Sequence, residues 1–278
     1  MASDWAHYWR SPDQPLEAMH AHFERHVYHR HSHETYSFGV TDDGAQGFAC
    51  RGGAHVSAAG MVMAFNPDDP HDGHAADPAG FTYRMVHIGP GLLAGLLSEQ
   101  AERDAGPGPG LPLFARPVLA DGALAGLVRR LHQALTGPVP ALARDEALGT
   151  AVTGLVSRAA GRAPRQAPVT GPDAARVARL VRRELEDCYA GNPSLADLAA
   201  ASGRSRFVAY RAFRAEYGLA PSDYQRQLRV REARRLIGQG RPIAEAAARA
   251  GFADQSHLNR WFARYLGITP AAYRRARG

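Results

Sequence analysis

The chain has 278 residues, enough for two domains that each bury a core, and its 45% hydrophobic and 22% charged residues exclude wholesale disorder. No apolar run approaches the roughly 20 residues that span a bilayer, and the N-terminus lacks the apolar core of a signal peptide, so we expect a cytoplasmic protein without a membrane partner. Residues 173–278 hold 20 arginines and 10 acidic residues, whereas the rest holds 13 arginines and 17 acidic residues. The positive charge of the C-terminal part indicates a polyanionic partner, with nucleic acid as the leading candidate.

Residues 26–88 are rich in histidine, glycine and aromatic residues, and they contain short apolar or alternating runs such as 36–40 and 60–65. Turns are expected between these runs at Asp42-Asp43-Gly44, at Arg51-Gly52-Gly53 and at Asn66-Pro67. Short runs separated by such turns predict an all-β sandwich or barrel.

Residues 92–160 change to helical spacing, which predicts amphipathic helices at 121–136 and 140–160. Their apolar positions are Leu124, Leu127, Val128, Leu131 and Leu135 in the first and Leu148, Val152, Leu155 and Val156 in the second. Residues 161–172 contain three prolines and two glycines without apolar periodicity, which predicts an exposed linker. We therefore expect one domain at 1–160 and another at 173–278.

The last zone contains an internal repeat. The first half of the repeated unit recurs 48 residues later and the second half 49 residues later, so one residue is inserted near its middle. The clearest matched pairs are Leu195 with Ile243, Gly203 with Gly251, Phe213 with Phe262 and Pro221 with Pro270. Each copy predicts a short helix, a turn around its glycine, and a second helix capped by Ser205 or Asp254. This is a helix-turn-helix layout.

In a helix-turn-helix unit the second helix lies in the major groove and its N-terminal residues face base edges, so exposed donors and stacking groups there are candidates for DNA contact. These candidates are Arg206, Phe207, Tyr210 and Arg211 in the first copy and Gln255, Ser256, His257, Asn259 and Arg260 in the second. Apolar residues at helical spacing are expected to point inward, namely Ala209, Ala212, Phe213, Leu258, Trp261 and Phe262.

The stretch from Ser222 to Gln239 is apolar on one face and predicts a helix that sets the distance between the two units. If that distance is near one duplex turn, about 34 Å, both units can enter successive segments of the major groove. One chain would then bind a bipartite site.

Three runs in this zone carry a family resemblance: Ile243–Gly251, the segment GFADQSHLNRWF that begins at Gly251, and Gly267-Ile268-Thr269-Pro270 followed by Tyr273. The stretch 194–275 resembles the DNA-binding domain of the AraC/XylS family of transcription regulators. The resemblance implies seven helices, a linker helix between two helix-turn-helix units, binding to double-stranded promoter DNA, and usually activation of a nearby RNA polymerase. Ala220 departs from the Ser or Thr usual before this proline, which predicts a weaker local helix cap.

The N-terminal zone is similar to the sensor of the same family, a small cupin-type β barrel, in residues 31–36 and 60–71. The resemblance implies an α+β two-domain protein, with a cupin-like barrel and packed helices followed by an all-α domain. Barrel mouths are common ligand sites, and histidines there can hydrogen-bond a polar effector. The effector-binding candidates are His31, His33, Tyr36 and His71.

A metal site is a second interpretation of the same histidines. His31 and His33 would share one face of a strand, and His71 could supply a third nitrogen ligand. However, the glutamate expected three or four residues after the second histidine in metal-binding cupins is missing, and Glu34 would point to the opposite face. We expect no cofactor and leave three interpretations open: a polar effector pocket, a metal site, and purely structural histidines.

The sequence therefore predicts a transcription regulator, an activator by family analogy and not an enzyme, whose barrel binds a small-molecule effector. The helices at 121–136 and 140–160 resemble a segment that often forms a homodimer contact in this family, although their apolar stripes could equally pack on their own barrel. Two alternatives remain. One is a cupin-type metal-dependent enzyme domain fused to a DNA-binding domain, and the other is a barrel that dimerises and senses nothing.

Overall fold

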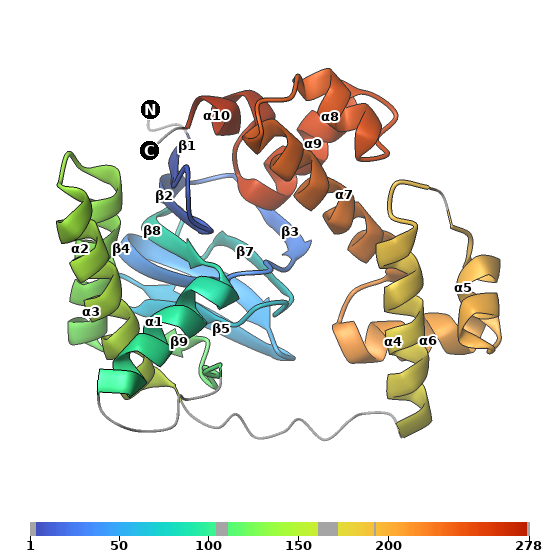
Figure 1. Cartoon of the computed structure of the whole chain (residues 1–278), viewed down its shortest axis with the longest axis horizontal. Coiled ribbons are helices and arrows are strands. Elements are labelled where there is room, and N and C mark those ends of the chain that lie inside the picture. Colours follow the sequence, from blue (N-terminus) through green and yellow to red (C-terminus); the bar gives the residue numbers. More distant parts are fainter. Residues whose placement is uncertain (1–3, 104–110, 161–171, 192, 277–278) are drawn as a thin grey trace. The chain divides into compact units, whose positions relative to one another are not determined.

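The computed structural model describes residues 4–103, 111–160, 172–191 and 193–276 (Figure 1). Two compact units make up the chain: residues 1–27, 32–164 and 276–278, which we call the sheet domain, and residues 165–275 with 28–31, which we call the helical domain. The linker predicted at 161–172 lies outside the described residues except for Pro172, where a helix begins. No helix in the described ranges is long and apolar enough to cross a membrane.

A nine-stranded sheet with antiparallel pairing forms the first domain, in agreement with the predicted all-β zone. Its main path is β1-β2-β8-β4-β6-β9, while β5 and β7 pair with β4, and β3 pairs with β7. The strands are β1 (Trp5–Arg10), β2 (Leu16–Phe23), β3 (Tyr28–His31), β4 (Tyr36–Cys50), β5 (Gly53–Ala58), β6 (Val62–Phe65), β7 (His71–Ala75), β8 (Phe81–Ile88) and β9 (Val118–Leu119). The sheet thus begins before residue 26, because β1 and β2 precede the predicted zone.

Strand β4 organises the sheet because it pairs with four other strands. Its first part pairs with β6 and its last part with β5, and the register against β8 shifts between Thr41 and Asp43. Such a bulge bends a strand and increases its twist, which lets one strand serve two sets of neighbours. The turn predicted at 42–44 is therefore wrong: these residues stay within β4.

Two contacts explain why the chain does not turn back at this bulge. The Asp42 carboxylate accepts hydrogen bonds from Arg84 Nε at 2.7 Å and from Arg129 Nε at 2.8 Å, which anchor the bulged residue. Gly44 has φ +68°, and a Cβ there would lie 2.1 Å from the carbonyl oxygen of Gly80. Only glycine fits that approach of two backbones.

The described residues of the sheet domain also form three helices: α1 (Pro90–Arg103), α2 (Gly122–Thr136) and α3 (Ala141–Ala159) (Figure 1). The two predicted helices are confirmed, whereas α1 was not predicted as a separate helix. The predicted apolar positions of α2 and α3 are buried or partly buried in one core with residues of β2, β4, β6 and β8. These stripes therefore pack within their own domain, as one of the two interpretations of them expected.

The helical domain contains α4 (Pro172–Asp187), α5 (Leu195–Ser202), α6 (Arg206–Tyr217), α7 (Pro221–Gly238), α8 (Ile243–Arg249), α9 (Gln255–Leu266) and α10 (Pro270–Arg275). Over the described part of this domain these are the seven helices that the family resemblance implies. The pairs α5–α6 and α8–α9 form the two repeated units, and α7 connects them. Helix α7 buries Tyr224, Val230, Ala233 and Leu236.

The inserted residue of the second repeat lies in the turn between its two helices. In the first unit Gly203 ends α5 with φ +64°, and the cap of α6, Ser205, follows two positions later. In the second unit Gly251 has φ +82°, and the cap of α9, Asp254, follows three positions later. The prediction of a one-residue change in a turn is confirmed.

Helix α7 begins without a side-chain cap, because its N-cap residue is Ala220. At the equivalent position before α10, Thr269 Oγ1 accepts a hydrogen bond from the amide of Ala272 at 3.1 Å. We expect Ala220→Thr to raise the free energy of unfolding of the full chain by about 1 kcal/mol, since a hydroxyl satisfies one free amide of the first turn. Urea titration measures the change, and Thr269→Ala should shift stability by a similar amount in the opposite direction. A destabilised Ala220→Thr variant would contradict the assignment.

Candidate DNA-binding helices and ligand site

Helix caps determine where the first helix-turn-helix unit begins and turns. Helix α5 starts with a capping box, in which the Asp197 carboxylate accepts from the Ser194 amide at 2.7 Å and the Ser194 hydroxyl accepts from the Asp197 amide. Helix α6 starts at Ser205, whose hydroxyl accepts from the Val208 amide at 3.4 Å. The first turn of α6 is therefore placed by local hydrogen bonds directly after the αL glycine that ends α5.

The two faces of α6 differ as predicted. Ala209, Ala212 and Phe213 are buried, whereas Arg211 is exposed and Tyr210 half-buried. Arg206 and Phe207 lie in the first turn, but the structure does not describe their side chains. Sequence analysis missed Val208, which is 42% exposed one turn before Arg211. An exposed apolar side chain on that face is suited to the methyl group of thymine, a contact that a search for polar donors does not find.

Helix α9 presents the predicted polar residues of the second unit. Asp254 caps it by accepting from the His257 amide at 2.6 Å. Gln255, Ser256 and Arg260 are exposed, while His257 and Asn259 are half-buried. The His257 ring packs edge-on against Phe252, with ring centroids 5.3 Å apart, so part of this side chain also holds the turn.

Trp261 departs from the prediction that it points inward. Leu258 and Phe262 are fully buried, but Trp261 is only half-buried. Its indole ring lies under the guanidinium group of Arg226 at 3.9 Å and beside that of Arg264 at 4.9 Å. Cation–π contacts of this kind attract a cation to the face of the indole ring, and the contact to Arg226 joins α9 to α7.

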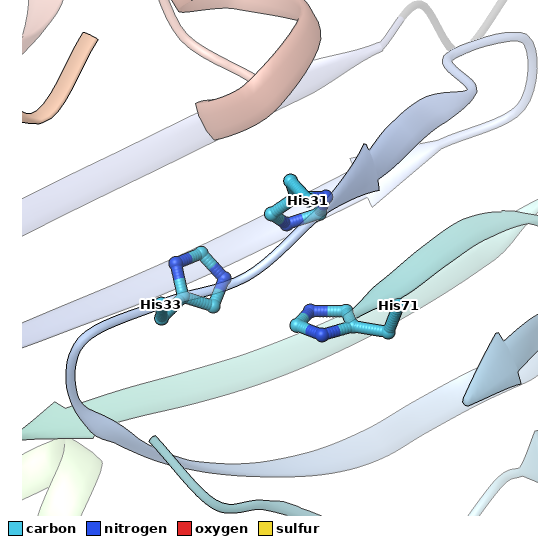
Figure 2. Close-up of side chains that lie close together, drawn as sticks. All are labelled: His31, His33 and His71. Carbon is cyan, nitrogen blue, oxygen red and sulfur yellow. The ribbon is translucent and has the colours of Figure 1, made fainter. Parts of the chain in front are cut away.

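The three histidines predicted as ligands lie close together. The candidate ligand nitrogens of His31, His33 and His71 all lie within 4.8 Å of one another, and Figure 2 shows the three imidazole rings gathered around one point. His31 ends β3, His33 follows two residues later, and His71 begins β7, with which β3 pairs. His31 and His71 are 4% and 6% exposed, which places both rings away from bulk water.

Two further residues adjoin these histidines and were missed by sequence analysis. The ring of His87 on β8 lies 4.8 Å from that of His33, and its Nδ1 is hydrogen-bonded to Ser37 Oγ at 2.8 Å. Ser37 and His87 are direct partners in the β4–β8 register, and both are buried. Only the pairing of strands distant in sequence brings His87 to this place.

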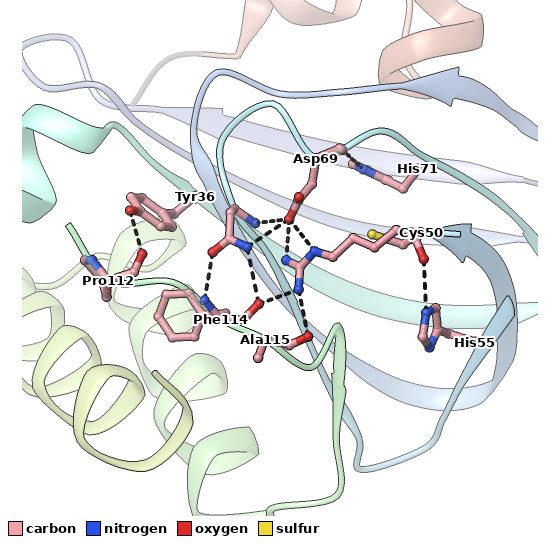
Figure 3. Close-up of polar contacts among 10 residues, drawn as sticks. Tyr36, Cys50, His55, Asp69, His71, Pro112, Phe114 and Ala115 are labelled. Atoms are coloured by element: carbon pink, nitrogen blue, oxygen red, sulfur yellow. Dashed lines mark hydrogen bonds and ion pairs between the residues drawn. The ribbon is translucent and has the colours of Figure 1, made fainter. Parts of the chain in front are cut away.

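Tyr36, the fourth predicted effector residue, follows His31 and His33 in the sequence and lies in the hydrophobic core. Its hydroxyl donates to the carbonyl oxygen of Pro112 at 2.9 Å (Figure 3), and burial raises the pKa of Tyr36 above its ordinary value. The ring stacks near Phe38 and meets Phe114 edge-on at 6.0 Å between centroids. Tyr36 therefore fastens the segment around Pro112 to β4.

A polar network holds the same segment from its other side (Figure 3). The Phe114 amide donates to Asn66 Oδ1 at 2.9 Å, and Asn66 Nδ2 donates to the Phe114 carbonyl oxygen at 3.2 Å. Arg51 donates to the carbonyl oxygens of Phe114 and Ala115 and forms an ion pair with Asp69. Arg51 has φ +51° in the turn after β4, so the predicted turn at 51–53 positions this guanidinium group.

His132 on α2 is a buried histidine outside this group, 1% exposed. Its Nε2 lies 3.1 Å from the carbonyl oxygen of Met19, and its Nδ1 lies 3.4 Å from Arg84 Nη1. Burial, then the positive charges of Arg84 and His20, lower the pKa of His132 from 6.5 to about 4, and the hydrogen bond to the Met19 carbonyl and the charge of Asp42 oppose this shift. His132 is therefore neutral in the folded chain at neutral pH.

This shift predicts acid sensitivity of the sheet domain. Between the unfolded-state pKa of 6.5 and the folded-state pKa of about 4, only the unfolded chain binds this proton. The stability contributed by neutral His132 is complete above the upper value and falls by about 1.4 kcal/mol per pH unit below it. We expect His132→Gln, which keeps a donor for the Met19 carbonyl, to lose less stability than the unchanged protein between about pH 7 and about pH 5 in urea titrations. Equal losses would assign the acid sensitivity to other groups.

With the geometry established, comparison with protein families gives a decisive match. The family model described as the AraC-like ligand binding domain matches residues 14–152, half of the chain, and a helix-turn-helix family model matches residues 198–276. The chain belongs to the AraC family of transcription regulators. It is thus an AraC-family regulator with an N-terminal ligand-binding domain and a helix-turn-helix DNA-binding domain.

Individual relatives agree with this assignment. The uncharacterized transcriptional regulator YbfI of Bacillus subtilis is 28% identical over 233 residues, which cover 82% of this chain and 80% of YbfI. The transcriptional activator NphR of a Rhodococcus species is 31% identical over 173 residues, 58% of this AraC-family chain and 49% of NphR. The crystal structure of ToxT from Vibrio cholerae with a bound unsaturated fatty acid has a TM-score of 0.54 at 10% identity and covers 99% of this chain and 96% of ToxT. That likeness shows a shared two-domain fold.

Proposed function

We propose that this regulator binds a bipartite promoter site by inserting α6 and α9 into successive segments of the major groove. The observation that carries the proposal is that each helix begins at a side-chain cap and presents exposed Arg211 or Gln255, Ser256 and Arg260 on the face opposite its buried residues. Helix α7, with 18 residues, rises about 27 Å, which is comparable with one duplex turn.

We further propose that a small-molecule effector binds in the sheet domain beside His33 and His71 and changes the affinity of the helical domain for DNA. Tyr36 supports this location, because its ring and hydroxyl connect the strand after the histidines to the segment around Pro112. An effector acts by binding one arrangement of the protein more tightly than another. The ToxT structure shows that a protein of this fold has been crystallised with a fatty acid.

Activation of transcription through contact with RNA polymerase, a cytoplasmic location, and a homodimer as the active form are part of the same proposal. The similarity to NphR, which is named as a transcriptional activator, supports activation rather than repression. The apolar faces of α2 and α3 are buried in the core of the sheet domain, so a homodimer contact would use other residues of these helices. The prediction that the protein is not an enzyme rests on its membership of a family of regulators.

Selection of binding sites from genomic DNA by the full chain, over a series of salt concentrations, tests the proposal. We expect a two-part consensus whose halves are about one helical turn apart and whose enrichment survives moderate salt. Weak binding that ignores sequence and falls steeply with salt would instead show that the arginines form a general polyanion surface.

A further inference from the structure

We propose that residues 188–191, which we call the α4–α5 loop, brace the two helix-turn-helix units against each other. Arg229 and Gly251 are the positioning residues of this brace, and through it they fix the spacing of the two half-sites that one chain recognises. The proposal rests on the proposed bipartite binding and adds what limits the distance between the halves.

The α4–α5 loop is tied to the first unit. Leu185 of α4 is buried in one cluster with Leu198 of α5 and Phe213 of α6. Directly after α4, the Gly191 amide donates to the Cys188 carbonyl oxygen at 3.0 Å and closes a tight turn. The loop therefore takes its position from the packing of α4 on the first unit.

Helix α7 holds the loop by two backbone carbonyl groups. The Tyr189 carbonyl oxygen accepts from Gln225 Nε2 at 3.1 Å and from Arg229 Nε at 2.8 Å. The Gly191 carbonyl oxygen accepts from Gln225 Nε2 at 2.8 Å and from Arg229 Nη2. Residues four apart share one face of a helix, so both donors reach the same loop. The bonds from Arg229 come from a charged donor and are the stronger ones.

The second unit contacts the same loop through Gly251. This residue follows α8 with φ +82°. A Cβ there would lie 2.5 Å from the carbonyl oxygen of Ala190 and 2.9 Å from its Cα. Two backbones approach each other here so closely that only glycine fits. The α4–α5 loop thus contacts α7 and the turn of the second unit together.

The internal repeat provides a contrast for this contact. Gly203 is the equivalent glycine of the first unit and has φ +64°, but a Cβ there would meet none of the described atoms within 4 Å. Alanine at either position has a similar strain from the left-handed backbone. The difference between alanine at Gly251 and alanine at Gly203 therefore reports the contact with the loop.

The brace matters because the spacing of half-sites is an angle as well as a distance. One additional base pair rotates a half-site by about 34° around the duplex and moves it by about 3.4 Å. Two recognition helices in a fixed relation can follow that change only by deforming the DNA, which costs binding free energy. Two units that can shift relative to each other would tolerate it.

The first measurement is the distance between α6 and α9 in the full chain without DNA. Ala215→Cys and Ser256→Cys are both exposed positions for spin labels, and Cys188→Ser removes the exposed native thiol while the buried Cys50 stays. Pulsed electron paramagnetic resonance should give one narrow distribution of distances for this labelled chain.

Gly251→Ala and Arg229→Ala should each broaden or displace that distribution. Gly203→Ala and Arg235→Ala are the matched controls and should leave it unchanged. Arg235 lies on the same helix as Arg229, is exposed, and donates to Glu232 of its own helix, so its loss removes an equal charge without loosening the loop.

The second measurement compares DNA binding to the selected site with binding to sites that have one base pair more or less between the halves. The unchanged protein should prefer the selected spacing at least about tenfold. Arg229→Ala and Gly251→Ala should lower that ratio at least about threefold, whereas both controls keep it. If Gly251→Ala does not fold by circular dichroism, Arg229→Ala decides.

Distances that stay as narrow in Arg229→Ala and Gly251→Ala as in the controls, or an unchanged spacing ratio, would overturn the proposal. If site selection gives no two-part consensus, the proposed bipartite binding fails and the spacing role fails with it. The distances between labels, measured without DNA, then still decide whether the loop braces the two units.

Discussion

Arg211→Ala is expected to weaken protection of one half of the DNA site, and Arg260→Ala that of the other half. Both arginines are exposed, and each lies six residues after the residue that caps its helix, Ser205 for α6 and Asp254 for α9. They therefore occupy equivalent turns of the two helices that enter the groove in helix-turn-helix proteins. A guanidinium group that makes two hydrogen bonds to guanine is worth about 1–3 kcal/mol of binding free energy. Footprinting on the selected site measures both effects.

The matched control is Arg214→Ala, which removes the same charge from the last turn of α6. We expect it to lower the affinity for DNA slightly and to weaken the protection of both half-sites equally. A charge far from the bases acts through general attraction to phosphates, so its loss should also reduce the dependence of binding on salt. If Arg211→Ala and Arg260→Ala changed the same half of the footprint, or if both matched Arg214→Ala, one chain would not read two half-sites. The bipartite proposal would then be wrong.

Phe114→Ala is expected to lower the free energy of unfolding of the sheet domain by about 3–5 kcal/mol. The ring is 0% exposed and meets Phe38 edge-on at 5.0 Å between centroids. Its backbone is held by Asn66 and Arg51, so the surrounding chain cannot collapse into the space that the ring leaves. Cavities that cannot close carry the largest penalties, and the loss is a large share of the stability of an ordinary domain.

Leu113→Ala provides the control for Phe114→Ala, because Leu113 precedes it and is 48% exposed. A substitution on the surface changes stability by no more than about 0.5 kcal/mol. Urea unfolding followed by near-ultraviolet circular dichroism compares the two variants. Equal effects would mean that the segment contributes through its backbone alone and that the ring does not stabilise the core.

The helix-turn-helix units were predictable because their determinants are local. Asp254 caps α9, Gly267 ends it in the αL conformation, and Leu258 and Phe262 are spaced to fall on one face. Trp261 shows the limit of that reasoning: its spacing suits a core, but Arg226 from another helix covers the indole ring. Helical periodicity identifies the side of a helix, and it does not identify what covers residues at the boundary of that side.

The sheet domain was less predictable because its determinants are distant in sequence. Asp42 reads as a turn residue until Arg84 and Arg129 are seen to bind its carboxylate within β4. His33 and His71 were candidates by residue type, but the approach of His87 depends on the β4–β8 register. Pairings of this kind follow from the whole sheet, so the sequence could name the histidines and could not place them relative to one another.

The extra residue between α8 and α9 makes the two helix-turn-helix units of one chain inequivalent. The DNA site of a single chain therefore has a direction. The two units differ in the length of their turns, and one presents Val208, Tyr210 and Arg211 where the other presents Gln255, Ser256 and Arg260. Two unlike reading surfaces on one chain cannot recognise a palindrome as equivalents. The promoter site for a single chain should therefore be non-palindromic, and reversing it should place the sheet domain on the other side relative to the start of transcription.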